Sequence, residues 1–227
     1  MFRRGLLAIL LLLLVASAAA EERRVLLDTI AATVHNDIIT MEEIRVQTEI
    51  LGRTGLWFTQ LDSPNPVTAK MVFDEVLARR LLFHAAMKMG FSEVAEADIE
   101  GETEAFRSTF ANLDEYRSWL REYEYRDDDF PANGIPGYKA FRPIRQEFYR
   151  RLAIEQYLSR KIGIQIKIAL TDYFEENKEK LQAAYPNVPP ERLPELARRQ
   201  LYLEKLQTHL QELRAQTTVL ILRDEFR

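Results

Sequence analysis

Histidines and carboxylates are the residues of this sequence best suited to acid–base or metal chemistry. The three histidines, His35, His84 and His209, lie far apart in the chain and form no metal-ligand pattern. His84 follows the apolar side of a predicted helix, which favours a structural histidine at the edge of a core, and the other two are interpreted in the same way. No pair of carboxylates is singled out for acid–base work. These residues therefore predict neither a catalytic centre nor a metal site.

The sequence also lacks the motifs of the major enzyme classes. It contains no G-x-S-x-G, no H-E-x-x-H, no phosphate-binding loop and no dinucleotide fingerprint. The run Asp127-Asp128-Asp129, with Asn133 and Gly134, offers oxygen atoms to calcium, but it lacks the alternating spacing and closing glutamate of a calcium loop. We interpret it as a solvated acidic loop. The expectation is a protein that is not an enzyme and needs no cofactor.

Aromatic side chains are the more promising feature, because they can bind apolar polypeptide segments. The chain has 12 Phe, 9 Tyr and 2 Trp, more than one small helical core needs. A single aromatic residue is more often part of the core than of a binding surface. The functional alternative is that some of these residues, together with flexible methionines, line an exposed surface that binds unfolded chains. Both interpretations stay open for the candidate client-binding residues, which are Trp57, Phe58, Met71, Phe106, Phe110, Trp119, Tyr123 and Tyr149.

The first twenty residues predict export. Two arginines precede an apolar run of ten residues, Leu6 to Val15, and small residues follow with possible cleavage sites after Ala18 and Ala20. This is the pattern of a cleavable secretory signal peptide, and the apolar run is short for a bilayer span. We therefore expect a periplasmic protein.

Composition narrows the classes of partner. With no cysteine, the chain forms no disulfide and carries no lipoprotein anchor. Loss of Arg3 and Arg4 with the signal peptide would leave 29 Lys and Arg against 35 Asp and Glu. An acidic chain has no electrostatic reason to bind nucleic acid or an anionic membrane. Its length suits one domain, or one domain with an appendage.

Local patterns at the start of the mature chain predict a β-hairpin and a capped helix. Ile30 to Val34 is apolar and partly β-branched, Asn36-Asp37 can form a tight turn, and Ile38 resumes the strand. Thr40 and Glu43 form a capping-box pattern at the start of the first helix.

Further helices are predicted from apolar residues at helical spacing, with Gly90 and Gly163 as stops. Their ranges are Val67 to Met89, Ala95 to Ala111, Asn112 to Tyr123, Phe141 to Lys161, Thr171 to Leu181, and a last helix from Pro194 onwards. Asn112 and Thr171 are predicted as the N-terminal caps of their helices. The segments between them are a loop over Trp57 to Pro66, an exposed excursion over Asp127 to Lys139, and a proline-rich connection over Gln182 to Leu193.

The end of the chain predicts how the fold closes. Thr217 to Leu222 is a β-branched apolar run with no strand nearby in the sequence, and a lone strand is not stable in water. The other strand material lies at Ile30 to Thr40, so we expect the two ends to meet in one sheet. The predicted fold class is mainly α, with a small sheet made from the N-terminal hairpin and the C-terminal strand.

Several segments, in order, resemble the SurA-type family of periplasmic chaperones. Thr29 to Thr40 resembles the family's opening strand, turn and capped helix, and Phe73 to Leu82 resembles its second helix. Asp172 to Leu181 is similar to the segment that normally leads into a parvulin-type isomerase domain, and Leu196 to Leu222 to the family's final helix and strand. One departure is His35, where the family usually has a small apolar residue.

The resemblance implies a domain plan. After a signal peptide at 1–20, a SurA-like N-terminal helical chaperone domain would span 21–181, with a loop insertion at 127–139. The connection at 182–193 stands where an isomerase domain would be expected, and 194–227 would pack back on the N-terminal domain. A domain of about a hundred residues does not fit into that connection.

The resemblance also implies a function. The expected activity is ATP-independent holding of unfolded or extended polypeptides, namely envelope and outer-membrane protein precursors. The alternative is a dedicated binding or assembly factor for one envelope complex. A peptidyl-prolyl isomerase is the least favoured possibility, because the isomerase domain is missing.

Overall fold

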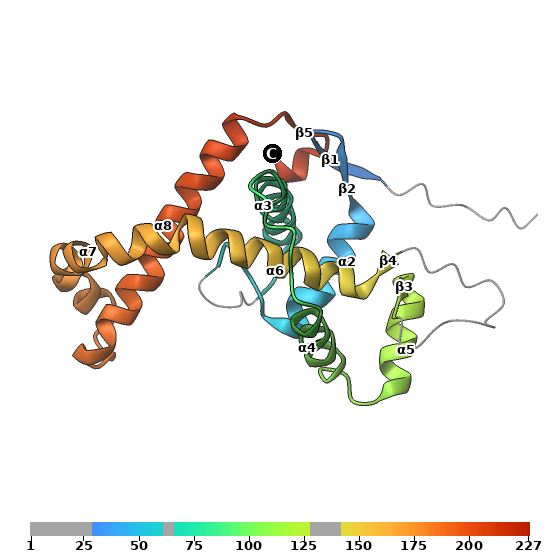
Figure 1. The fold of residues 1–227 in the computed structure, drawn as a ribbon, viewed down its shortest axis with the longest axis horizontal. Helices are drawn as coiled ribbons and strands as arrows, with labels where there is room; N and C mark the ends of the chain where they lie inside the picture. Colours follow the sequence, from blue (N-terminus) through green and yellow to red (C-terminus); the bar gives the residue numbers. More distant parts are fainter. Residues whose placement is uncertain (1–28, 61–65, 128–141) are drawn as a thin grey trace, which may run out of the picture.

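The protein is described here by a computed structural model over residues 29–60, 66–127 and 142–227 (Figure 1). Within these residues it is mainly α-helical, with a three-stranded antiparallel sheet in the order β2-β1-β5 and a two-stranded parallel pair, β3-β4. This architecture confirms the predicted fold class.

Seven helices follow one another in the described residues. They are α2 (Met41–Thr54), α3 (Ala69–Lys88), α4 (Glu96–Arg107), α5 (Leu113–Glu122), α6 (Ile144–Lys161), α7 (Gly163–Ala184) and α8 (Leu193–Ala215). Two 3₁₀ turns lie at Pro190–Arg192 and Asp224–Phe226, and the parallel pair is β3 (Tyr125–Arg126) with β4 (Arg142–Pro143).

The two ends of the described chain meet in the three-stranded sheet, as predicted. The central strand β1 (Ile30–Val34) pairs with β2 (Asp37–Thr40) on one side and with β5 (Val219–Ile221) on the other. Just beyond β5, the Leu222 N–H donates to the Ala31 carbonyl at 2.9 Å. The chain therefore closes on itself through backbone hydrogen bonds between segments about 190 residues apart.

The hairpin turn differs slightly from the prediction. It lies at His35 and Asn36, one residue earlier than the predicted Asn36-Asp37 turn, and His35 has a positive φ of 52°. Histidine is among the residues that tolerate this left-handed conformation better than most. The His35 N–H donates to the Thr218 carbonyl at 3.0 Å, so the turn also contacts the C-terminal segment.

Two of the predicted helix caps are present. The Thr40 hydroxyl accepts a hydrogen bond from the Glu43 N–H at 3.1 Å, and the Asn112 side chain accepts one from the Glu115 N–H at 2.9 Å. The Glu43 carboxylate also pairs with Arg80 of α3, which ties the first turn of α2 to its neighbour. A cap of this kind stabilises a helix by about 1 kcal/mol.

The prediction of a short helix capped by Thr171 is wrong. Helix α7 already begins at Gly163 and continues to Ala184, so Thr171 lies inside it and the predicted connection at 182–193 is shorter. A glycine costs a helix only about 1 kcal/mol. Ile166 and Leu181 are buried in two hydrophobic clusters that also contain residues of α8, and this burial offsets the cost of the glycine. Pro194 does lie in the first turn of α8, as predicted.

The exposed excursion predicted over Asp127 to Lys139 is wrong at its first residue. Asp127 is only 2% exposed, and its carboxylate accepts hydrogen bonds from the Tyr116 hydroxyl at 2.5 Å and the Arg107 guanidinium at 3.1 Å. Burial and this carboxylate together raise the pKa of Tyr116. Asp127 is thus an anchor between α4 and α5; residues 128–139 lie outside the described residues. Helix α4 also ends four residues before the predicted Ala111.

The last 3₁₀ turn fixes the C-terminal segment in the core beneath the sheet. Phe226 is 1% exposed and stacks on Phe73 of α3, with ring centroids 4.4 Å apart. Lys70 donates to the Phe226 carbonyl at 3.0 Å. Closure of the fold therefore includes side-chain packing as well as strand pairing.

We expect Phe226→Ala to lower the free energy of unfolding by about 3–5 kcal/mol, because it removes a buried aromatic ring and leaves a cavity against Phe73. Urea denaturation followed by circular dichroism measures this. Glu225→Ala, in the same turn, changes an exposed side chain and should shift stability by less than about 1 kcal/mol. Equal stability of the two variants would show that the C-terminal turn does not hold the fold together.

Candidate functional site

A groove with a volume of about 460 Å³ opens where the loop after α2 meets helices α6, α7 and α8. This volume lies within the usual range of ligand pockets. Its apolar lining consists of Trp57, Phe58, Leu158, Ile166, Tyr202 and Leu203, and its polar lining includes Gln60, Glu155, Ser159, Arg198 and Arg199. Segments about 140 residues apart in the sequence thus form one apolar surface with a polar margin.

The groove forms where α8 lies against the end of α6 and the start of α7. Helix α6 ends at Lys161 and α7 begins at Gly163, and the single residue between them, Ile162, is buried. Helix α8 then runs back past both of them toward the sheet (Figure 1). On α8, Leu201 and Leu206 are buried in the core shared with α6 and α7, whereas Leu203 is only half-buried and lines the groove.

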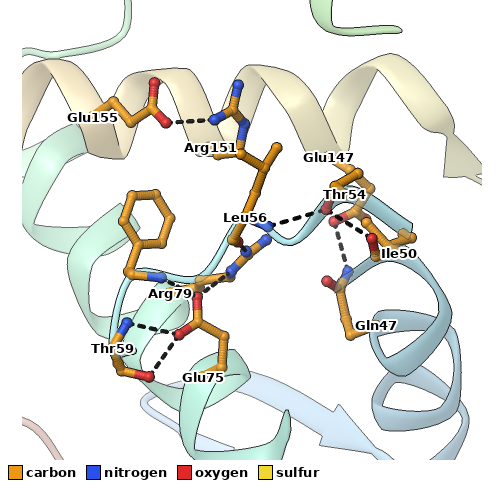
Figure 2. Close-up of polar contacts among 11 residues, drawn as sticks. Gln47, Ile50, Thr54, Leu56, Thr59, Glu75, Arg79, Glu147, Arg151 and Glu155 are labelled. Carbon is orange, nitrogen blue, oxygen red and sulfur yellow. Dashed lines mark hydrogen bonds and ion pairs between the residues drawn. The ribbon is translucent and has the colours of Figure 1, made fainter. Parts of the chain in front are cut away.

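The loop that forms one wall is held by a buried carboxylate, shown in Figure 2. Glu75 of α3 is fully buried and accepts hydrogen bonds from the N–H groups of Phe58 and Thr59, both at 3.0 Å, and from the Thr59 hydroxyl at 2.8 Å. Its charge is paired with Arg79 at 2.8 Å, and Arg79 also donates to the Leu56 carbonyl at 2.5 Å. The backbone of the loop is therefore fixed at three positions around Trp57, namely Leu56, Phe58 and Thr59.

The same loop is also fixed where it leaves α2. Gly55 ends the helix in a left-handed conformation with φ 64°, which lets its N–H donate to the Leu51 carbonyl at 2.8 Å. The Thr54 hydroxyl donates to the Ile50 carbonyl at 2.7 Å and accepts from the Leu56 N–H at 3.4 Å (Figure 2). A wall that is already ordered lowers the entropy cost of binding.

Two titratable side chains of the groove, Glu155 and Tyr202, have raised pKa values. Glu155 of α6 accepts a hydrogen bond from Arg151 at 2.5 Å, and Arg151, only 7% exposed, also pairs with Glu102 at 2.6 Å. Burial nevertheless raises the pKa of Glu155 above its ordinary value. Burial also raises the pKa of the Tyr202 phenol to about 12, with Glu155 adding to the effect. The phenol therefore remains protonated at neutral pH and can donate a hydrogen bond.

The structure separates the eight candidate client-binding residues into core and surface. Trp57 is half-buried and Phe58 is 8% exposed, and both line the groove. Phe106, Phe110 and Trp119 belong to the core, the first of the two interpretations that the sequence left open. Their rings pack edge to face between α4, α5 and α6, with centroids 5.1 to 5.8 Å apart.

The remaining candidates lie away from the groove. Tyr123 is half-buried beside the aromatic core, with its ring centroid 5.0 Å from that of Trp119. Tyr149 is half-buried and donates to the Ser92 carbonyl at 3.1 Å, and Met71 is half-buried in the first turn of α3. None of these three lines the groove.

Most residues that line the groove were not predicted from the sequence. Leu158, Ile166 and Leu203 follow the apolar spacing of ordinary core positions, and nothing distinguishes them locally from buried neighbours. The one usable signal is that Arg198-Arg199 stands one helical turn before Tyr202-Leu203, which places charge beside apolar surface on the same helix.

All three histidines line a second hollow, of about 340 Å³, between the hairpin turn, α3, α6 and α8. His84 hydrogen-bonds Asp37 at 2.9 Å and His209 hydrogen-bonds Tyr157 at 2.6 Å, so both have structural partners. Among the described residues, no group of three or more His, Asp or Glu side chains is arranged to hold a metal ion. Across residues 29–60, 66–127 and 142–227, no helix combines the length and apolar character that a membrane span needs.

Comparison of the chain with protein-family models, curated proteins and solved structures finds no match. The SurA-type resemblance therefore stays a prediction from the sequence, and the groove itself has to carry the functional argument.

We expect Glu75→Gln to loosen the groove wall and to destabilise the protein by about 3–5 kcal/mol, because it breaks a buried ion pair and leaves Arg79 without its charge partner. Hydrogen exchange should become faster at the amides of Phe58 and Thr59, while the Leu222 amide in the sheet keeps its relative protection.

Asp74→Asn is the matched control for this change. Asp74 is the preceding residue of α3, and its ion pair with Lys70 at 2.7 Å is exposed, so its loss should cost less than about 1 kcal/mol. The account of the loop is contradicted if the two variants are equally stable and exchange at Phe58 and Thr59 is unchanged.

Proposed function

We propose that this protein is an ATP-independent holding chaperone that binds unfolded or extended polypeptides in the groove between the loop after α2 and helices α6, α7 and α8. The observation that carries the proposal is the groove's composition: aromatic and aliphatic side chains from separate segments line it, with polar groups at the margin. A surface that has to hold many sequences needs apolar area more than a fixed set of polar partners.

The physical properties of the groove suit weak and reversible holding. Full burial of one large apolar side chain contributes about 1.5–3 kcal/mol. The ordering of a flexible client segment opposes this gain. Trp57 and Tyr202 add contact area with few rotatable bonds, and the Tyr202 phenol can donate to a client carbonyl. Client release is then simple dissociation, which requires no nucleotide.

The compartment and the clients belong to the same proposal. The signal-like first twenty residues and the SurA-type resemblance support an exported, periplasmic protein whose clients are outer-membrane protein precursors. Helices α7 and α8 are joined by residues 185–189 and one 3₁₀ turn. The short connection supports a chaperone without an isomerase domain between these helices.

The purified protein, without nucleotide, should delay aggregation of several unrelated outer-membrane proteins diluted from urea, measured by light scattering. Leu203→Ser should weaken holding about fivefold or more, because it removes a half-buried apolar side chain from the groove. Leu220→Ser is the control, since Leu220 is exposed in the sheet and lies outside the groove. Phe58 is unsuitable for this test because it is buried.

The alternatives give different results in the same experiments. Protection of one client only would favour a dedicated assembly factor, and no effect on any unfolded client would refute general holding. Uncatalysed cis/trans exchange of a proline peptide takes tens of seconds or longer. Acceleration of this exchange by the protein would favour an isomerase. If Leu220→Ser weakens holding as much as Leu203→Ser, clients do not bind in the groove.

A further inference from the structure

The hollow that gathers the three histidines also contains two lysines, Lys88 and Lys161. Its volume of about 340 Å³ lies at the lower end of the range for ligand pockets. Of the described residues that line it, none also lines the groove. Lys88 is the last residue of α3 and Lys161 the last residue of α6, so the fold brings two ammonium groups from different helices to one concave surface.

The cationic and donor groups of the hollow include several without a partner in the protein. In the part of the chain that the structure describes, neither Lys88 nor Lys161 has an ion-pair or hydrogen-bond partner, and both are exposed. The side chain of His35 has no hydrogen-bond partner among these residues either, and its ring contacts that of His84 with centroids 5.6 Å apart. These three side chains can therefore donate hydrogen bonds to a ligand.

The acidic groups around the hollow already have partners. Glu212 is the one carboxylate among the described lining residues, and it lies 3.3 Å from Nδ1 of His209. Asp37, which does not line the hollow, hydrogen-bonds His84 at 2.9 Å and lies 3.7 Å from Arg80. With the histidines neutral, two ammonium groups face one carboxylate, and the lining has one positive charge in excess.

The helix ends beside the hollow do not cancel this charge. Helices α3 and α8 both end here, and a helix carries partial negative charge on its last carbonyl groups. Carbonyl groups in these last turns accept hydrogen bonds from the N–H groups of Met89, Gly90, Gln216 and Thr217. The full charges of the two lysines are therefore the strongest that an anion meets in this hollow.

Part of the lining is apolar. Leu81 and Ala85 of α3 and Leu213 of α8 contribute aliphatic surface, and Met89, which is 66% exposed, adds a flexible thioether. A ligand that matches both parts has an anionic head and an apolar tail. One excess positive charge is neutralised by a single carboxylate, whereas a doubly charged phosphate would leave negative charge in the hollow.

We propose that this hollow is a second binding site, which takes a small carboxylate with an apolar tail. Lys88 and Lys161 bind the carboxylate, and Leu81, Leu213 and Met89 contact the tail. The same chemistry is offered by a free fatty acid and by the last residue of a polypeptide. The site does not depend on the proposed holding function, because the hollow and the groove have separate linings.

Isothermal titration calorimetry of the purified protein with octanoate tests this site. Acetate has the same charge without the tail, and octanol has the same tail without the charge. Each should bind at least about tenfold more weakly than octanoate, because burial of the tail contributes about 0.8 kcal/mol per CH₂ group and a charged acceptor makes the stronger hydrogen bonds. Salt at about 0.5 M should weaken octanoate binding.

The double variant Lys88→Gln with Lys161→Gln should weaken octanoate binding by about three- to tenfold, as expected for the loss of two exposed ion pairs. Lys167→Gln with Lys180→Gln is the matched control, because it makes the same charge change at exposed positions of α7 outside the hollow and should bind octanoate like the wild type. Thermal melts verify that both double variants are folded.

Two peptides that end in leucine, one with a free C-terminal carboxylate and one with a C-terminal amide, distinguish the sources of the ligand. Binding of the carboxylate peptide and not of the amide assigns the site to a polypeptide end, and binding of octanoate without either peptide assigns it to a free acid. The site is refuted if neither octanoate nor the carboxylate peptide binds, if octanol binds as tightly as octanoate, or if both double variants lose affinity equally. The holding of unfolded clients is measured separately, and its outcome leaves this inference unchanged.

Discussion

The groove depends above all on the buried carboxylate of Glu75. A charge removed from water costs several kcal/mol unless it is paired and hydrogen-bonded. In this structure Arg79 supplies the opposite charge, and the loop after α2 supplies three donors from Phe58 and Thr59 (Figure 2). The loop has one low-energy arrangement because any other would leave this carboxylate short of partners. A loop that would otherwise have many conformations thus becomes a wall of the groove.

Helix α8 links the groove to the three-stranded sheet in which the two ends of the described chain pair. Its first half contributes Tyr202 and Leu203 to the groove, and its last turn leads into β5, which pairs with β1. Strand pairing and the packing of Phe226 on Phe73 therefore limit where α8 can lie. The sheet thus helps to set the position of one groove wall, and Trp57 of the groove packs against the same hydrophobic cluster as the sheet residues.

Local patterns predicted the parts of this protein that short-range interactions determine. The β-hairpin and the caps at Thr40 and Asn112 need only neighbouring residues, and the terminal sheet followed because no other strand material could pair with β5. The extent of α7, the burial of Asp127 and the gathering of three histidines depend on contacts between distant segments. The groove also depends on contacts between distant segments. In the sequence alone, Trp57 and Leu203 look like ordinary apolar residues, and only the placement of α6, α7 and α8 brings them together.

The aromatic core and the groove are made of different residues. The aromatic side chains that suggested a client surface, such as Phe106 and Trp119, mostly pack against one another between α4, α5 and α6, away from the groove. The apolar lining of the groove combines buried residues, namely Phe58, Leu158 and Ile166, with half-buried ones, namely Trp57, Tyr202 and Leu203. Replacement of a half-buried residue removes contact area without opening a core cavity. For the proposed holding function this separation is useful, because the half-buried apolar groups can contact clients of different shape while the aromatic core keeps the helices in place.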